Sequence, residues 1–284
     1  MIRLDPSTVL LQWATGGLLF LWVTTRRREL GVGYGWLLRG VYLFMAAGAV
    51  ASGRLVHPDS FRDALAAVVA AAATAALVVS VARRRAGAGR QREHQERQRA
   101  RVAAMTGRSL DPPTNVSLGP EFPPALDLLA PAVGVVALVV AAVADGGPHP
   151  LAIARTLIGA CFLGAVTDAM LLGHWYLVQP GLGRAPLLEL VRWATVIWPA
   201  EVVVLLLPTG MVSVLTGRVN DGWGGTLGWF WVACALATVV LLYVTRKALD
   251  ERAYSAVMAA TGLLYLAILT ASGTDLVARA VLAR

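Results

Sequence analysis

The sequence predicts an all-α fold, a polytopic bundle of about eight transmembrane helices. Apolar residues make up 57% of the 284 residues, charged residues only 15%, and the mean hydropathy is +0.64, outside the range of an ordinary soluble domain. Eight segments are long and apolar enough to span a bilayer, which takes about 20 helical residues. Basic residues gather between these segments, where they orient helices in a membrane.

The expected spans are, approximately, residues 8–24, 35–52, 64–82, 124–144, 151–178, 186–215, 227–244 and 253–272. The first resembles a signal peptide, but it lacks an A-x-A cleavage site and ends at three consecutive arginines, so we expect a transmembrane helix. The chain divides into residues 1–82 with spans one to three, a cytoplasmic loop of residues 83–123, and residues 124–284 with spans four to eight.

The distribution of basic residues predicts the orientation. If the N-terminus lies outside, the inner loops carry 16 basic residues and the outer segments six, so both termini are expected outside. The 83–123 loop supplies nine of the 16; its first half is basic and its second half proline-rich. We expect it to be either a solvated helical extension or a disordered arm, meeting membrane lipids or docking other subunits of a membrane complex.

Composition also narrows the class of protein. Lys247 is the only lysine among 25 basic residues, a bias typical of a GC-rich genome, so the net charge of +8 does not indicate nucleic-acid binding. We expect a multi-pass protein of a bacterial cytoplasmic (inner) membrane. Cys161 and Cys234 each lie in an apolar run and are expected to be buried thiols, with no disulfide and no metal site. Walker A, GxSxG, HExxH and paired-histidine motifs are absent from the sequence.

The candidate site is the hairpin of residues 159–210, where ionisable side chains lie in apolar surroundings. Such residues are costly in a bilayer and commonly functional. They are Asp168, His174, Arg192 and Glu201. Positions equidistant from the turn near Gly183 should share a depth, which puts Asp168 level with Trp198 and within a turn of Glu201, and His174 level with Arg192.

The two carboxyl groups are candidates for proton handling. Pro199 and Pro208 leave the carbonyls of Thr195 and Val204 without their helical donors, so a kink beside Glu201 is expected. Asp168 and Glu201 could bind a proton or cation, and would form one titrating pair if they met. The alternative is a neutral acid that hydrogen-bonds a neighbouring helix.

His174, Trp175 and Tyr176, together with Arg192 and Trp198, are the candidate ligand-binding residues. A histidine level with an arginine and flanked by aromatic rings suits a quinone carbonyl or a lipid phosphate. The alternative is that the aromatic residues are interfacial anchors. Haem is not expected, because the other histidines lie in loops and none can supply a second ligand within the membrane.

Other polar residues are expected to be structural. Arg39 should extend to the inner headgroups, and Asp275 should cap its helix or meet headgroups. Two further spans each carry a polar stripe on one face, which favours an interhelical hydrogen-bond seam over a pathway and predicts that both spans face the bundle interior. The stripes are Trp231, Cys234, Thr238 and Thr245 in the seventh span, and Tyr254, Thr261, Tyr265 and Ser272 in the eighth.

These observations favour an integral, non-haem subunit of a redox or energy-coupling assembly that binds a quinone or lipid-like molecule. A proton- or cation-coupled small-solute transporter and an intramembrane lipid-modifying enzyme, with Asp168, His174 and Glu201 as acid or base, remain alternatives. A purely structural or assembly protein also remains open.

Overall fold

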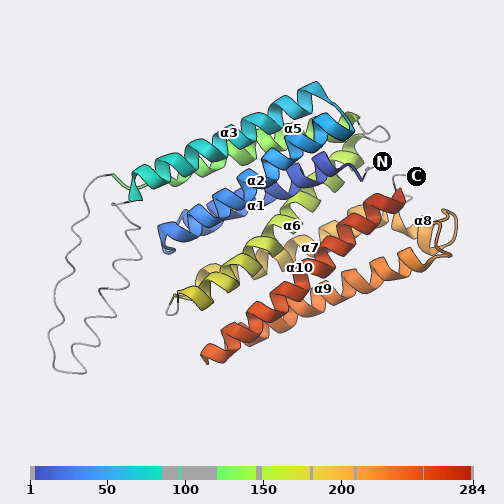
Figure 1. Cartoon of the computed structure of the whole chain (residues 1–284). Helices are drawn as coiled ribbons and strands as arrows, with labels where there is room; N and C mark the ends of the chain where they lie inside the picture. Colours follow the sequence, from blue (N-terminus) through green and yellow to red (C-terminus); the bar gives the residue numbers. More distant parts are fainter. Residues whose placement is uncertain are drawn as a thin grey trace.

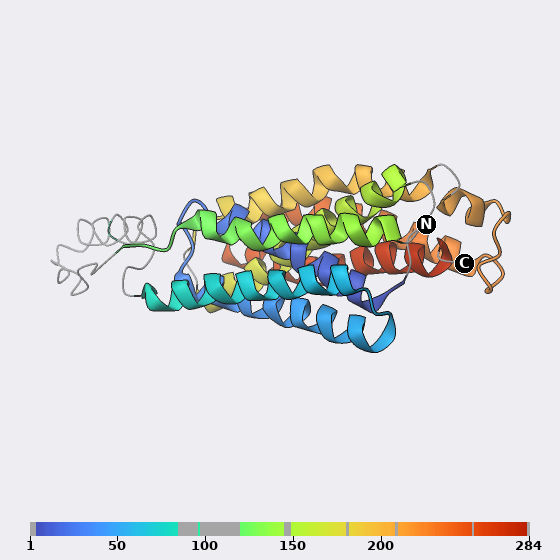
Figure 2. The ribbon, with the colours of Figure 1, turned by 90° about the horizontal axis from the view of Figure 1, so that it is seen from above.

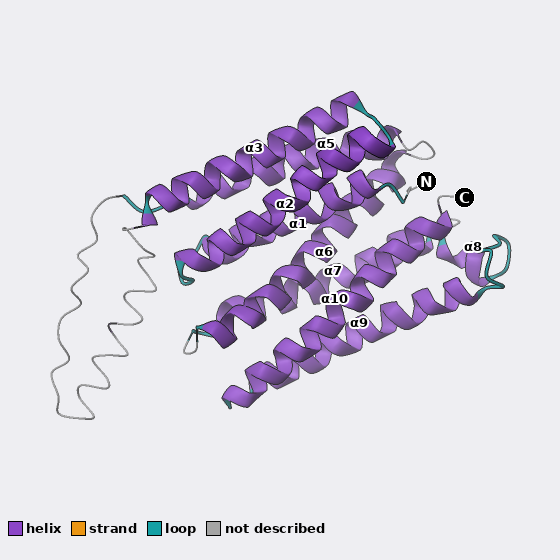
Figure 3. Cartoon of the chain, viewed as in Figure 1, coloured by secondary structure: helices purple, strands orange, loops and turns teal. Residues whose placement is uncertain are grey.

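The computed structural model describes residues 4–84, 96, 120–144, 149–179, 182–207, 210–251 and 253–282. All regular secondary structure within these residues is helical (Figure 3), which confirms the predicted all-α class. Most of the predicted 83–123 loop lies outside the described residues.

The elements follow the predicted spans closely. They are α1 (Pro6–Thr25), α2 (Val32–Val56), α3 (Ser60–Ala82), the 3-10 turn η2 (Pro124–Leu128) that leads into α5 (Leu129–Ala144), α6 (His149–Val178), α7 (Ala185–Leu206), α8 (Met211–Leu215), α9 (Thr226–Asp250) and α10 (Tyr254–Leu282). Carboxylates begin two of them: Asp5 accepts the amide of Thr8 at 3.0 Å, and Asp59 accepts the amide of Arg62 at 3.0 Å.

The predicted sixth span is divided in the structure. Residues 186–215 were expected to form one helix, but α7 ends at Leu206 and the short α8 begins at Met211. A proline at 208 cannot donate to the helix, which is the physical reason for the interruption. Pro199, by contrast, lies inside α7. The last helix, α10, continues past its predicted end at residue 272 to Leu282.

Seven of the described helices are long and apolar enough to cross a membrane, the pattern of a multi-pass membrane protein. The seven are α1, α2, α3, η2 with α5, α6, α9 and α10. In contrast, α7 carries three charged residues, Glu189, Arg192 and Glu201, although it packs beside α6 and α9 in the same bundle (Figure 1). A count of eight spans therefore stays a prediction, as does the side on which the termini lie.

The helices run side by side along one axis, and both ends of the chain lie at the same end of the bundle (Figures 1 and 2). The central pair is α1 and α6, each of which also packs against several other helices. A Cβ on Gly16 of α1 would collide with the backbone of Ala160 of α6, so small residues let these two helices approach closely. The predicted stripe on α9 is buried throughout, at Trp231, Cys234, Thr238 and Thr245. The stripe predicted on α10 is not: Thr261 is buried, but Tyr254 and Tyr265 are 48% and 43% exposed.

Candidate functional site

Asp168 lies at the centre of a fully buried polar contact between α6 and α2. The Tyr42 hydroxyl donates to Asp168 Oδ1, and Oδ2 has no hydrogen-bond partner among the described residues. The Tyr42 ring lies over Gly17 of α1, where any Cβ would collide with it. The buried Tyr34 phenol is a further electrostatic neighbour of Asp168. The Tyr42 ring thus fills the space that Gly17 leaves on α1, and through it α2 hydrogen-bonds to Asp168.

Glu201 lies in a different cluster, between α7, α6 and α10. Its side chain is 0% exposed, and neither carboxyl oxygen has a hydrogen-bond partner among the described residues. Its electrostatic neighbours are Asp275 and Arg279 of α10 and Arg155 of α6. The described interactions therefore place Glu201 and Asp168 in separate networks, with none joining the two acids.

The two α10 residues of this second cluster hydrogen-bond each other and a residue of α1. Arg279 Nε donates to Asp275 Oδ2 at 2.8 Å, while Gln12 of α1 donates to Asp275 Oδ1 at 3.3 Å and accepts from the Arg279 guanidinium. Asp275 was expected to cap its helix or meet headgroups. It is instead 1% exposed, because the guanidinium one turn away and the Gln12 amide supply the donors that water would otherwise provide.

Arg155 ends α7. Its Nε donates to the Val204 carbonyl at 2.8 Å and one terminal nitrogen to the Leu207 carbonyl at 2.5 Å. The Val204 carbonyl is the one that a proline at 208 deprives of its helical donor. Arg155 therefore satisfies a carbonyl that would be costly to leave unpaired inside a membrane.

Arg39 is buried, although it was expected to reach the headgroups. It is 2% exposed. Its Nε and one terminal nitrogen donate to the two carboxylate oxygens of Asp127 at 2.8 and 2.6 Å. Ser80 Oγ accepts a further bond at 3.2 Å, and the Phe122 ring centroid lies 4.3 Å from Cζ. A bidentate carboxylate makes burial of this guanidinium tolerable.

The five predicted ligand-binding residues do not meet in one described contact. His174 is exposed on α6, with Nδ1 3.1 Å from the Tyr265 hydroxyl of α10, whereas Arg192 is exposed on α7. Trp175 donates to Gln179 at 3.1 Å and meets Tyr34 edge to face. The remaining two are bound within the bundle: Tyr176 donates to the Gly183 carbonyl and Trp198 to the Ala235 carbonyl of α9, the latter at 3.0 Å.

An apolar groove, which the sequence reasoning missed, runs beside α1 between α5 and α7. Two adjoining cavities of about 480 and 410 Å³ form it, and both are bounded by Leu19, Leu157 and Cys161. The larger cavity is further lined by Phe20, Trp22, Val23, Arg26, Ile158, Trp193, Val196, Ile197 and Ala200. The smaller is further lined by Thr15, Gly16, Leu128, Pro131, Ala132, Val135, Leu138 and Ala160. Because nearly every lining group is apolar, the sequence offered no polar signal there.

One end of the larger cavity carries its charged group. The Arg26 guanidinium lies 5.2 Å from the Trp22 ring centroid and 2.5 Å from a Glu189 carboxylate oxygen of α7. Arg27 lies 3.3 Å from the other Glu189 oxygen. The groove therefore has an apolar length and a polar end, the shape that an amphiphilic ligand requires.

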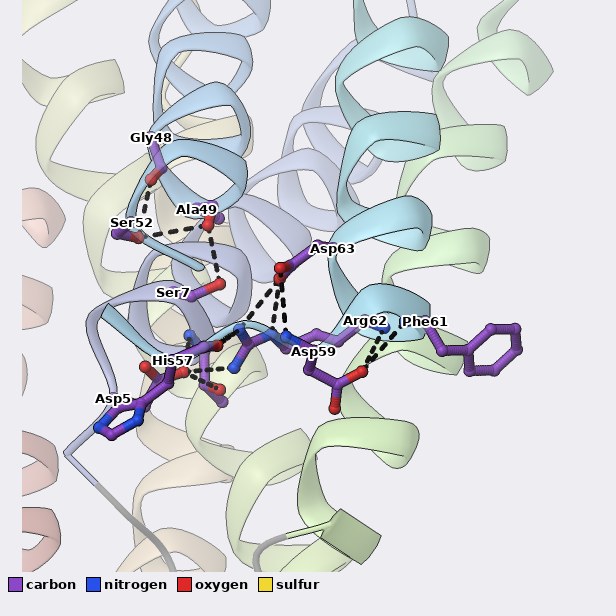
Figure 4. A network of polar contacts seen from close by, with 11 residues as sticks. Asp5, Ser7, Gly48, Ala49, Ser52, His57, Asp59, Phe61, Arg62 and Asp63 are labelled. Atoms are coloured by element: carbon purple, nitrogen blue, oxygen red, sulfur yellow. Dashed lines mark hydrogen bonds and ion pairs between the residues drawn. The ribbon is translucent and has the colours of Figure 1, made fainter. Parts of the chain in front are cut away.

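A further buried network fastens the end of the bundle where the chain termini lie. Arg62 of α3 donates to Asp5 at 2.6 Å, to Asp63 at 2.9 Å and to the His57 carbonyl at 2.7 Å (Figure 4). In the same view Ser7 donates to the Ala49 carbonyl of α2 at 2.8 Å. With every Arg62 bond directed to a helix end or loop, we interpret this network as structural.

Among the described residues, no group of three or more histidine, cysteine, aspartate or glutamate side chains is placed to hold a metal ion. Comparison of the chain with protein-family models, with curated proteins and with solved structures finds no match.

Proposed function

We propose that this protein is an integral membrane subunit of a redox or energy-coupling assembly, and that it binds a quinone or lipid-like molecule in the groove beside α1. The observation that carries the proposal is the pair of adjoining cavities bounded by Leu19, Leu157 and Cys161. Their volumes lie within the roughly 300–1,000 Å³ of small-molecule sites, and their walls suit an isoprenoid or acyl chain.

The polar end of the groove supports an amphiphile rather than a plain hydrocarbon. Arg26 presents a guanidinium that can donate to a quinone carbonyl or a phosphate oxygen, with the Trp22 ring beside it and Trp193 in the wall of the same cavity. This moves the proposed ligand from His174 and Arg192, which line neither cavity, to the neighbouring face of α7.

Proton-coupled transport is the second candidate function, and the buried carboxyl groups favour it. Asp168 and Glu201 are both 0% exposed and retain oxygens without a hydrogen-bond partner among the described residues. Ionisable groups of this kind occur in proton relays of transporters. Replacement of Asp168 by asparagine should abolish proton-coupled uptake under this candidate and leave groove binding unchanged under the first.

Cys161 allows the groove proposal to be tested, because its half-buried thiol bounds both cavities. The Cys234→Ser protein would be reconstituted in vesicles of defined phospholipid, with or without menaquinone or ubiquinone, and in detergent. The rate of Cys161 modification by a membrane-permeant maleimide would be measured. A quinone at ten times its Kd should slow modification about tenfold.

The arms of this experiment separate the two ligand sources. Slower modification in phospholipid vesicles than in detergent, with no further effect of quinone, indicates a lipid occupant, whereas protection by quinone indicates a quinone. In Ile158→Trp, which fills the groove, the added protection should disappear; the matched control Val240→Trp, on an exposed position of α9, should behave like the parent. Equal rates in all three environments would refute the proposal.

A further inference from the structure

Arg155 and Glu201 are two complementary charges of one buried cluster that are not hydrogen-bonded to each other. Asp275 and Arg279 hydrogen-bond each other and Gln12, and Arg155 and Glu201 are the second cation and acid of the cluster. Arg155 donates hydrogen bonds to the Val204 and Leu207 carbonyls. Glu201 has no donor among the described residues.

This pattern leaves the carboxyl group in a site that stabilises its neutral form. A buried carboxylate without a donor is costly, and binding a proton removes most of that cost. Once ionised, Glu201 would be a stronger acceptor for Arg155 than a backbone carbonyl is. Glu201 lies three residues before Val204 on the same helix face, so the guanidinium need move by no more than about one 5.4 Å turn.

The guanidinium lies directly against the break between α7 and α8. A Cβ on Gly210 would lie 2.9 Å from an Arg155 terminal nitrogen and would collide with the Leu205 carbonyl, so the guanidinium packs directly on this glycine. α7 and α8 meet here with only residues 207–210 between them, and Leu207 is extended. The carbonyls that Arg155 binds are thus those at the break in the helix.

We propose that Glu201 is a proton-binding site, and that loss of its proton to solvent transfers Arg155 from the Val204 and Leu207 carbonyls to the Glu201 carboxylate. The transfer exchanges two charge-to-carbonyl hydrogen bonds for an ion pair and leaves the end of α7 uncapped. Proton binding at Glu201 and the capping of α7 by Arg155 are therefore linked. This inference does not depend on what the groove holds.

Charged and titratable side chains surround Glu201 from two helices, α6 and α10. α6 contributes Arg155 and the Cys161 thiol, and α10 contributes the Asp275–Arg279 pair. α1 contributes the neutral Gln12. The short α8 has no charged residue, and α9 carries its own at the far end, in its last two turns. Arg155 is thus the described cation near Glu201 whose hydrogen bonds are made to backbone carbonyls rather than to a carboxylate.

The test is hydrogen–deuterium exchange of the full chain in phospholipid nanodiscs, across a pH series and corrected for intrinsic exchange rates. In the wild type, protection of the amides of residues 205–207 and 210–216 should fall about tenfold or more as Glu201 loses its proton. Glu201→Gln cannot ionise and should keep this segment protected at every pH. Arg155→Met removes the donors and should leave the segment unprotected at every pH.

Glu189→Gln is the matched control, the same substitution on the same helix, and should retain the wild-type pH dependence. If Glu201→Gln and wild type lose protection equally with pH, the proposal fails. Should Glu201→Gln not fold, infrared spectra of Asp168→Asn would report Glu201, the buried carboxyl group that has no hydrogen-bond donor to either oxygen among the described residues. Its carbonyl band should disappear over the same pH range in which protection of residues 205–207 and 210–216 falls, and a band that disappears without any fall in protection would also overturn the proposal.

Discussion

Because Gly17 has no side chain, it leaves room for a buried hydrogen bond between α2 and α6. The ring of Tyr42, on α2, occupies the position that a Cβ of Gly17 would take, and its hydroxyl donates to Asp168 of α6. Without that bond the carboxyl group of Asp168 would lack a donor among the described residues, a costly state for a group that is 0% exposed. A glycine on one helix therefore determines the polar contact between two others.

We expect Gly17→Ala to destabilise the protein by about 1–3 kcal/mol, because the new methyl group would force the Tyr42 ring aside in a packed interior. The midpoint of thermal unfolding in detergent would measure the change. The control is Gly40→Ala on α2, where a Cβ has no atom within 4 Å and where alanine should stabilise the helix by about 0.5–1 kcal/mol. Equal midpoints for the two variants would contradict the role assigned to Gly17.

At the scale of elements, α9 begins at a loop that one carboxylate organises. Asp221 Oδ1 accepts the amides of Trp223 and Gly225, each at 2.9 Å, and Oδ2 accepts the amide of Leu227 at 2.9 Å in the first turn of α9. Gly225 takes a left-handed backbone with φ of 87°, which turns the chain into the helix. The amide donors, that of Gly225 foremost, lower the pKa of Asp221 below its ordinary value of 3.8.

The direction of this pKa shift predicts how the loop responds to acid. Because the folded pKa lies below the unfolded one, the Asp221 carboxylate stabilises the loop at pH values above 3.8, and this contribution is lost as the pH falls through the lowered pKa. We expect hydrogen-exchange protection of residues 221–228, corrected for intrinsic rates, to fall only in that acidic window. Asp221→Asn should show lower protection at neutral pH and no such acid-dependent loss.

Asp250→Asn, at the other end of α9, serves as the control for this measurement and should leave the 221–228 segment as in the wild type. An acid-dependent loss of protection that persists unchanged in Asp221→Asn would assign the effect to another group.

At the scale of the whole molecule, arginines are paired with acids at both ends of the bundle. Arg26, Arg27 and Arg28 follow α1 at the end opposite the termini and pair with Glu189 and Glu121. At the end with the termini, Arg62 and Arg279 are buried in ion pairs, so fewer basic groups are free to meet headgroups there than the sequence count implied. Because acidic partners engage arginines at both ends, the predicted orientation still rests on the count of basic residues in the sequence.

Single cysteines in a Cys161→Ser, Cys234→Ser background would test this orientation and the crossing of α7. With both termini outside, His57→Cys and Arg218→Cys should react with an impermeant maleimide on intact spheroplasts. Glu29→Cys and Gln179→Cys should react only after lysis. Reaction of Arg218→Cys on the same side as Gln179→Cys would mean that α7 does not cross the membrane, and the reverse pattern at all four positions would invert the orientation.

The sequence by itself determined the helical class, the multi-pass character and most helix bounds, because hydropathy and proline act locally along the chain. It also identified Asp168 and Glu201 as buried acids and Val204 as a carbonyl that needs a donor. It could not identify partners that lie far apart in sequence: Arg39 with Asp127, Gln12 with Asp275, or Arg155 with the end of α7.

Only the tertiary structure decided those pairings, and it decided the groove as well. Which face of a helix meets which neighbour depends on the rotation and close approach of whole helices, and glycines such as Gly16 set that approach through contacts absent from any single segment. An apolar groove has the same composition as an apolar interface. Its existence therefore depends on which side chains fail to meet, and that follows from packing in three dimensions.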